Sequence, residues 1–146
     1  MDIIDFLMDD HVKMQKEMVA IRQDIFHGNA TQRIRTLIER YELHESIEEE
    51  ILFPKFEDAL RSRSDAQLSK CVDAHGEIWE LFGKMVDCLN SRRCKGLQEA
   101  FFEFSASAEA HIRHEERVLF PTIREYVDKQ VLKDLLEKAR KRHGCD

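Results

Sequence analysis

The chain has 146 residues, of which 36% are charged and only seven are Gly or Pro, and its formal net charge is −6. This length predicts one domain that can bury a core without disulfide bonds, and the composition favours an all-α protein. The negative charge argues against non-specific binding of nucleic acid. The single basic cluster, KARKRH near the C-terminus, is typical of the positively charged end of a last helix.

The cysteines and the N-terminus bear on the cellular compartment. No two of the four cysteines form a C-x-x-C pair, which indicates reduced thiols and a cytoplasmic protein. The N-terminal segment MDIIDFLMDD is too acidic for a signal peptide, and no apolar run approaches the ~20 residues that span a membrane. The cysteines are Cys71, Cys88, Cys94 and Cys145.

Two stripes of apolar residues, at alternating spacings of three and four, predict the first two helices. The first stripe covers residues 4–25 and includes His11, and the Gly-Asn pair in residues 27–29 predicts a helix stop. The second stripe covers residues 34–51 and includes Tyr41, His44 and Glu48.

Three further helices follow. Residues 61–65 (RSRSD) predict a loop, in which Ser64 or Asp65 caps the next helix. The third stripe covers residues 68–89, with Cys71 and His75, and a break from Asn90 to Gly96 precedes the fourth, residues 101–118, with His111 and Glu115. A short fifth helix is expected over about residues 128–142.

The short connections predict an antiparallel up-down-up-down bundle of four helices over about residues 3–125, followed by the fifth helix. The whole chain, residues 1–146, would then be a single domain. Pro54 and Pro121 are each expected to kink or end a helix.

The motif H-x-x-x-E-E-x-x-L-F-P occurs twice, beginning at His44 and at His111. A His and a Glu four residues apart lie one turn apart on the same face of a helix. The two motifs and the histidines of the other two stripes therefore bring six polar groups into the core. The six are His11, His44, Glu48, His75, His111 and Glu115.

Burial of these groups requires a partner. An unsatisfied buried polar group costs about 1–3 kcal/mol, whereas a whole domain is stable by only about 5–15 kcal/mol. Bound cations satisfy such a cluster best, so the duplication predicts a two-metal site. Imidazole together with bridging carboxylate suits iron best, with manganese and zinc as alternatives.

The order and spacing of these six residues resemble the hemerythrin-like, HHE cation-binding family, in particular its bacterial single-domain members. The resemblance covers nearly the whole chain and implies a left-handed four-helix bundle with two iron ions. Glu48 and Glu115 would bridge the irons together with an oxo or hydroxo group. His11 and His44 would bind one iron, and His75 and His111 the other.

The chain departs from the oxygen-carrying hemerythrins, which have five histidines, two of them four residues apart on the third helix. Here Cys71 lies one turn before His75 and Trp79 one turn after it, so the third helix supplies a single His. We therefore expect a more symmetric pair of metal positions, with four His and two Glu.

Four other residues are candidates for places around the centre. Cys71 is either a fifth ligand or a small core residue, and packing is the simpler interpretation. Tyr41 either donates a hydrogen bond to a metal-bound ligand or packs in the core. Glu45 is either an additional carboxylate near the metals or part of a solvated helix face. His114 either supports a ligand or packs at the edge of the bundle.

Three functions are compatible with such a site. The leading hypothesis is a monomer that binds dioxygen, or another small diatomic ligand, for storage, delivery or sensing. The resemblance also implies a di-iron enzyme acting on peroxide or nitric oxide or in iron–sulfur cluster repair, or an iron-sensing regulatory domain that folds on metal binding. The apolar lining of the site is expected from Leu7, Met14, Ile51, Ile78, Phe104 and Val118.

Overall fold

The computed structural model describes residues 1–28 and 30–144, with the backbone alone for Cys94, and this part of the chain is helical with no strand. The all-α prediction is thus confirmed. The first segments are α1 (Ile3–Asp24) with the 3₁₀ turn η1 (Ile25–His27), and α2 (Thr31–Ile47), η2 (Glu48–Leu52) and α3 (Phe53–Leu60). They are followed by α4 (Ala66–Asn90), α5 (Cys94–His114), η3 (Glu115–Leu119), α6 (Phe120–Tyr126) and α7 (Lys129–His143).

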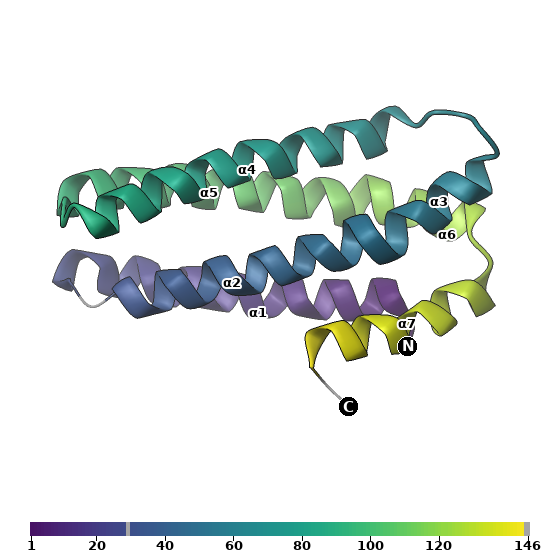
Figure 1. The fold of residues 1–146 in the computed structure, drawn as a ribbon, viewed down its shortest axis with the longest axis horizontal. Coiled ribbons are helices and arrows are strands. Elements are labelled where there is room, and N and C mark those ends of the chain that lie inside the picture. Colours follow the sequence, from purple (N-terminus) through teal and green to yellow (C-terminus); the bar gives the residue numbers. More distant parts are fainter. Residues whose placement is uncertain (29, 145–146) are drawn as a thin grey trace.

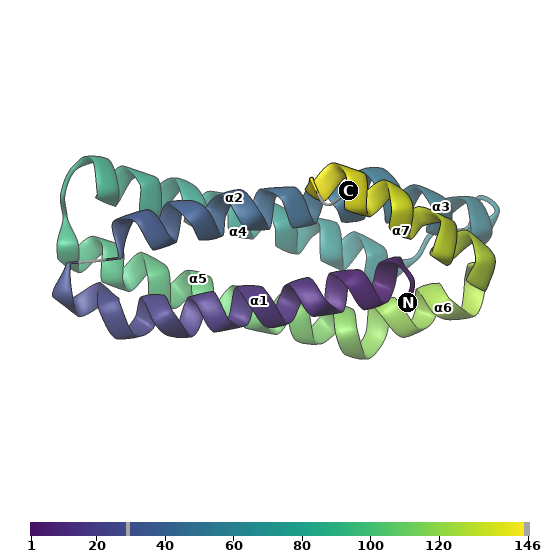
Figure 2. The same cartoon turned by 90° about the horizontal axis from the view of Figure 1, so that it is seen from below.

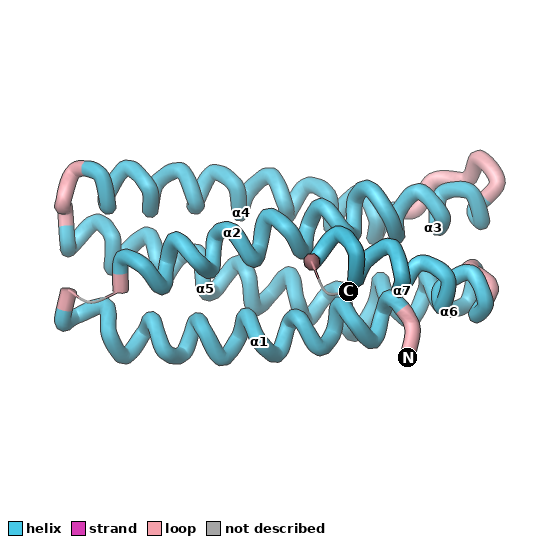
Figure 3. Tube along the Cα trace, turned by 60° about the horizontal axis from the view of Figure 1, so that its bottom comes forward, coloured by secondary structure: helices cyan, strands magenta, loops and turns pink. Residues whose placement is uncertain are grey.

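Long helical segments lie side by side along the molecule: α1, α2 with α3, α4, and α5 with α6 (Figures 1 and 2). The turns after α1 and after α4 lie at one end, and the connection from α3 to α4 lies at the other. The connections between helices are therefore gathered at or near the two ends of the molecule (Figure 3), and the four long helical segments run between them.

Side-chain caps explain where the helices begin. The side chain of Asp2 accepts from the backbone of Asp5, the side chain of Asp5 accepts from the backbone of Asp2, and Arg124 of α6 pairs with both carboxylates. Asp65 accepts from the backbone N–H groups that begin α4, which confirms one of the two predicted caps. Asp128 caps α7 in the same way.

The breaks differ from the predicted ones in length. The turn after α1 passes through Gly28 with φ 74°, a conformation that favours glycine, whereas the predicted stop residue Asn29 lies outside the described residues. The break before α5 is shorter than the predicted one from Asn90 to Gly96, because α5 already begins at Cys94. The turn is closed instead by the N–H of Arg93, which donates to the carbonyl of Cys88.

The repeated motifs contain a π-helical turn each, at η2 and η3. Pro54 and Pro121 follow these turns, in the first turn of α3 and α6, where a missing N–H is tolerated. Neither proline ends its helical segment. A π turn is wider than an α turn, and it shifts the residues beyond it around the helix axis.

The apolar residues form two core clusters, and the polar members of the stripes lie between them. One cluster includes Met14, Tyr41 and Phe104, and the other includes Leu7 and Phe56. On α1, for example, the buried His11 lies between Leu7 and Met14. None of the described helices combines the length and the apolar composition needed to cross a membrane.

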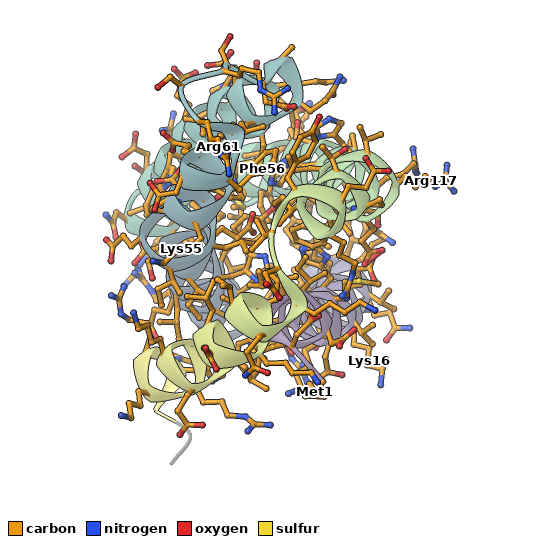
Figure 4. The ribbon with its side chains drawn as sticks, turned by 90° about the vertical axis from the view of Figure 1, so that its right-hand side faces the viewer. Met1, Lys16, Lys55, Phe56, Arg61 and Arg117 are labelled. Carbon is orange, nitrogen blue, oxygen red and sulfur yellow. The ribbon has the colours of Figure 1, made fainter. Side chains whose placement is uncertain are left out.

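The short helix α7 packs against α1, α2 and η2. Figure 4 views the molecule from the end at which α3, α6 and α7 gather, with the buried Phe56 labelled there and Arg117 projecting outward. Leu132 and Leu135 of α7 belong to the same core cluster as Phe56, so α7 covers one side of the bundle end.

Phe104 and Phe102 offer a matched test of this core. Phe104 is fully buried, with its ring against those of Tyr41 and Phe82, whereas Phe102 is 39% exposed on the same helix. We expect Phe104→Ala to lower the free energy of unfolding by about 3–5 kcal/mol because it leaves a cavity. Phe102→Ala should lower it by about 1 kcal/mol or less. Urea denaturation measures both, and equal losses would contradict the assignment of the core.

Candidate metal site

The six predicted ligands come together in the polar layer between the two core clusters. His11 comes from α1, His44 and Glu48 from α2 and η2, His75 from α4, and His111 and Glu115 from α5 and η3. All six are buried, with at most 5% of each residue exposed. The helical stripes therefore place these side chains where the repeat predicts them.

The first group of donor atoms comprises His11, His44, Glu48 and Glu115. The Nε2 atom of His11 lies 3.1 Å from Nε2 of His44 and 3.1 Å from Oε1 of Glu115. Oε1 of Glu48 lies 2.5 Å from Nε2 of His44. One donor atom from each of the four residues lies within 4.8 Å of all the others.

The second group comprises Glu48, Cys71, His75, His111 and Glu115, whose donor atoms are also within 4.8 Å of one another. The Sγ atom of Cys71 lies 3.7 Å from Nε2 of His75 and 3.8 Å from Nε2 of His111. Its S–H donates to Oε2 of Glu115 at 3.5 Å. Glu48 and Glu115 belong to both groups, so each could reach two cations at once.

Three of the four imidazoles have a carboxylate at the ring nitrogen that faces away from the centre. The Nδ1 atoms of His11, His44 and His75 lie 3.2, 2.9 and 2.7 Å from carboxylate oxygens. A proton on Nδ1 leaves Nε2 with its lone pair toward the centre, as a metal ligand requires. These three carboxylates, which the sequence analysis missed, belong to Glu116, Asp10 and Glu49.

Two of these carboxylates follow from the repeat. Glu49 and Glu116 are the second Glu of the two E-E pairs, and each reaches the His of a neighbouring helix. That repeated second Glu was the signal in the sequence that could have identified them. Asp10, which directly precedes His11, had no such signal, because the residue before His75 is Ala74.

That difference makes the two halves unequal. Asp10 supports His44, but the corresponding position in the other half holds Ala74, and the buried Nδ1 atom of His111 has no hydrogen-bond partner. The halves thus match in their six candidate ligands and differ around them.

The structure places three of the four other candidates. Glu45 is 3% exposed, so the solvated helix face is wrong, and burial raises the pKa of its carboxyl to about 8. Tyr41 is buried, with its ring 6.3 Å from that of His44 and edge-on to two Phe rings. The Nε2 atom of His114 lies 2.7 Å from Oε1 of Gln67 near the surface.

One residue of the expected apolar lining is misplaced. Val118 is 38% exposed, whereas Ile51, at the equivalent position of the other motif, is buried because α7 packs on η2. The other expected members of the lining are buried, namely Leu7, Met14, Ile78 and Phe104.

Electrostatics divides the four imidazoles into two pairs. Burial lowers the pKa of His11 to about 4 and that of His111 to about 3. Burial also disfavours charged His44, but Glu48 and Asp10 outweigh this effect and hold its pKa well above the usual value. The pKa of His75 is raised against the same burial effect, by Glu48, Glu45 and Glu49.

The arrangement fits a cation on grounds independent of the sequence motif. Oε2 of Glu48 is buried without a hydrogen bond, whereas Oε1 is paired with Nε2 of His44, and burial together with Glu115 raises the pKa of this carboxyl. Orphaned buried carboxylate oxygens are costly, and a cation shared with the facing Nε2 atoms would satisfy them. A set of imidazole and carboxylate donors suits iron, manganese or zinc.

In its described residues the protein is helical, and four helical segments contribute a buried cluster of His and Glu donors. These features place it among the metal-binding helical proteins. The family model described as the Hemerythrin HHE cation binding domain matches this chain twice, over residues 2–94 and 66–145. The chain belongs to this family, as the resemblance predicted. No curated protein and no solved structure matched it.

The raised pKa values of His44 and His75 predict how metal affinity depends on pH. A metal must displace the proton from each of these imidazoles below its pKa, and both values lie above 6.5. We therefore expect the affinity for Zn²⁺ to begin falling at a pH above 6.5, by about tenfold per pH unit for each imidazole. Competition with a chromophoric chelator from pH 9 to 5 measures the profile.

Asp10→Asn provides the matched variant for this profile. It removes the carboxylate that helps to raise the pKa of His44, so the decline should begin at a lower pH. The affinity at high pH should fall about 10- to 100-fold, because the neutral amide is a weaker acceptor for Nδ1 and leaves the imidazole less basic. An affinity that stays constant from pH 9 to 5 in the unsubstituted protein would contradict binding through these histidines.

Proposed function

We propose that this protein binds two iron ions per chain and uses them to bind dioxygen, for storage, delivery or sensing. The observation that carries the proposal is the pair of donor groups that share Glu48 and Glu115. We also propose that residues 1–146 form one domain, an antiparallel up-down-up-down bundle with α7 added, and that it acts as a cytoplasmic monomer.

In this proposal His11 and His44 hold one iron, His75 and His111 hold the other, and the two shared glutamates bridge them. When bound, reduced iron supplies the electrons and the open coordination position that a diatomic ligand requires. The outer carboxylates of Asp10, Glu49 and Glu116 keep three of the imidazoles oriented with Nε2 toward the centre.

The core clusters on both sides keep water from the centre. Leu7, Met14 and Phe104 are fully buried, and such an apolar surround favours a neutral diatomic molecule over water or charged ligands. A surface pocket of about 250 Å³ between α4 and α5 is lined by His111, by the small residues Ala74, Ser107 and Ala110, and by Lys70, Glu77, Ile78 and His114. We propose this pocket as the route of the ligand.

The experiment that tests the function is the visible absorption spectrum of the protein reconstituted with Fe²⁺ without oxygen and then exposed to air. We expect charge-transfer bands that appear with oxygen and disappear when it is removed, because the apolar surround slows irreversible oxidation. Metal analysis of the same sample should give two iron ions per chain.

Irreversible oxidation in that experiment would favour the second candidate, a di-iron enzyme acting on peroxide or nitric oxide. One observation supports this candidate: Glu45 is buried beside the centre, and burial raises the pKa of its carboxyl to about 8. A carboxyl group that stays protonated at neutral pH can supply a proton to a bound substrate.

The two shared glutamates predict the effect of removing a bridge. Glu48→Ala or Glu115→Ala should reduce the iron content from two ions per chain to one or fewer, because each carboxylate serves both positions. Glu50→Ala is the control, since Glu50 lies in the same segment but is exposed and pairs with Arg142. Metal analysis after reconstitution and desalting measures the content. Two irons retained in either bridge variant would refute the assignment.

A further inference from the structure

The two halves of the site differ at one reactive position. His75 lies 64 positions after His11, and at the same offset Cys71 corresponds to Leu7. Both residues are fully buried one turn before their histidine. The chain therefore places a sulfur beside one candidate metal position and a hydrocarbon side chain beside the other.

The sulfur atom occupies the place of a ligand. Its distances to Nε2 of His75, Nε2 of His111 and Oε2 of Glu115 are 3.7, 3.8 and 3.5 Å. Around a four-coordinate ion, a sulfur ligand at about 2.3 Å and a nitrogen ligand at about 2.0–2.1 Å lie about 3.6 Å apart. The sulfur thus stands in the same relation to its neighbours as one ligand to the others.

Charge gives an independent argument. Around the first position, two outer carboxylates, Asp10 and Glu116, support the two imidazoles. Around the second, Glu49 supports His75, but Ala74 stands in place of the Asp, and the buried Nδ1 of His111 has no partner. The second position thus has one hydrogen-bonded outer carboxylate fewer than the first, and a thiolate at Cys71 would add a negative charge there.

We propose that Cys71 is a thiolate ligand of the metal ion held by His75 and His111, so that the two metal positions are chemically different. As the metal–sulfur bond forms, the S–H bond breaks and its proton passes to the buffer. Oε2 of Glu115, which accepts that S–H in the absence of metal, is then free to bind as well. This inference requires a metal ion at the second position, as in the proposed function, but it does not require dioxygen.

A sulfur donor would make the second position selective. Thiolate is a soft ligand that favours zinc, cobalt and iron over manganese, which prefers oxygen donors. The first position, with imidazole and carboxylate alone, lacks that preference. The packing interpretation of Cys71, in contrast, predicts two positions of similar selectivity.

Cobalt(II) is the probe that distinguishes a sulfur ligand, because a Co²⁺–thiolate bond produces a charge-transfer band in the near ultraviolet. Metal-free protein is titrated with Co²⁺ without oxygen, and bound cobalt is measured in parallel. We expect two bound ions and a band with the intensity of one cobalt–sulfur bond per chain. Cys71→Ser should lose the band entirely while it still binds at least one cobalt ion.

Three controls exclude other sources of the band. Cys88→Ser, at a half-buried cysteine on the same helix, should keep it, and so should a chain in which Cys71 is the only cysteine left. Glu45→Gln should keep it as well, which separates the sulfur from the neighbouring buried carboxylate.

The outcomes separate this inference from the proposed function. Two cobalt ions bound without the band, or a band that survives in Cys71→Ser, would overturn the inference and leave the di-iron proposal intact. An intact band in a protein whose iron form does not bind dioxygen reversibly would confirm the sulfur ligand and refute the oxygen-binding function alone. A chain that binds no cobalt would overturn both.

Discussion

The structure depends on the burial of six ionisable side chains between two apolar clusters. In each stripe, His or Glu occupies one or two of the core positions. The apolar residues on either side hold the helices in the register that aligns these positions. Burying the clusters supplies the favourable free energy, whereas the polar layer opposes folding until its groups are satisfied. Oε2 of Glu48, which is buried without a hydrogen bond, shows that side-chain contacts alone leave this layer incomplete. A cation therefore completes the core as well as the site.

The duplicated motif explains the different roles of adjacent Glu residues. Because the same H-x-x-x-E-E segment occurs on two helices, one Glu of each pair faces the centre and the next reaches the outer nitrogen of a neighbouring imidazole. The π turn that begins at the first Glu widens the helix at this point, which allows adjacent residues to serve both purposes. The departures from the repeat, Cys71 for Leu7 and Ala74 for Asp10, change the surroundings of one position and leave the shared ligands unchanged.

The sequence predicted the helical stripes and the convergence of the six polar groups, because a period of 3.6 residues determines which side chains share a face. This helical period does not predict the contacts between helices. Glu45 resembles a solvated residue in the sequence, and it is buried only because α4 passes beside α2. The π turns depend on backbone hydrogen bonds that the prolines alone do not specify. Val118 was misassigned for a related reason: Ile51, its counterpart, is buried by α7, and the repeat contains no information about that helix.

The helix α7 contributes to the site through Asp10. This carboxylate accepts from Nδ1 of His44 at 2.9 Å, and it also lies 3.7 Å from Arg40 and 3.8 Å from His143 near the end of α7. Burial alone would raise the pKa of Asp10, but His44, His143 and Arg40 outweigh it and keep the pKa below its usual value. One residue of the basic C-terminal cluster, His143, therefore has an effect beyond the end of its own helix. It helps to keep ionised the carboxylate that orients His44, which connects the last helix of the chain to the first group of donors.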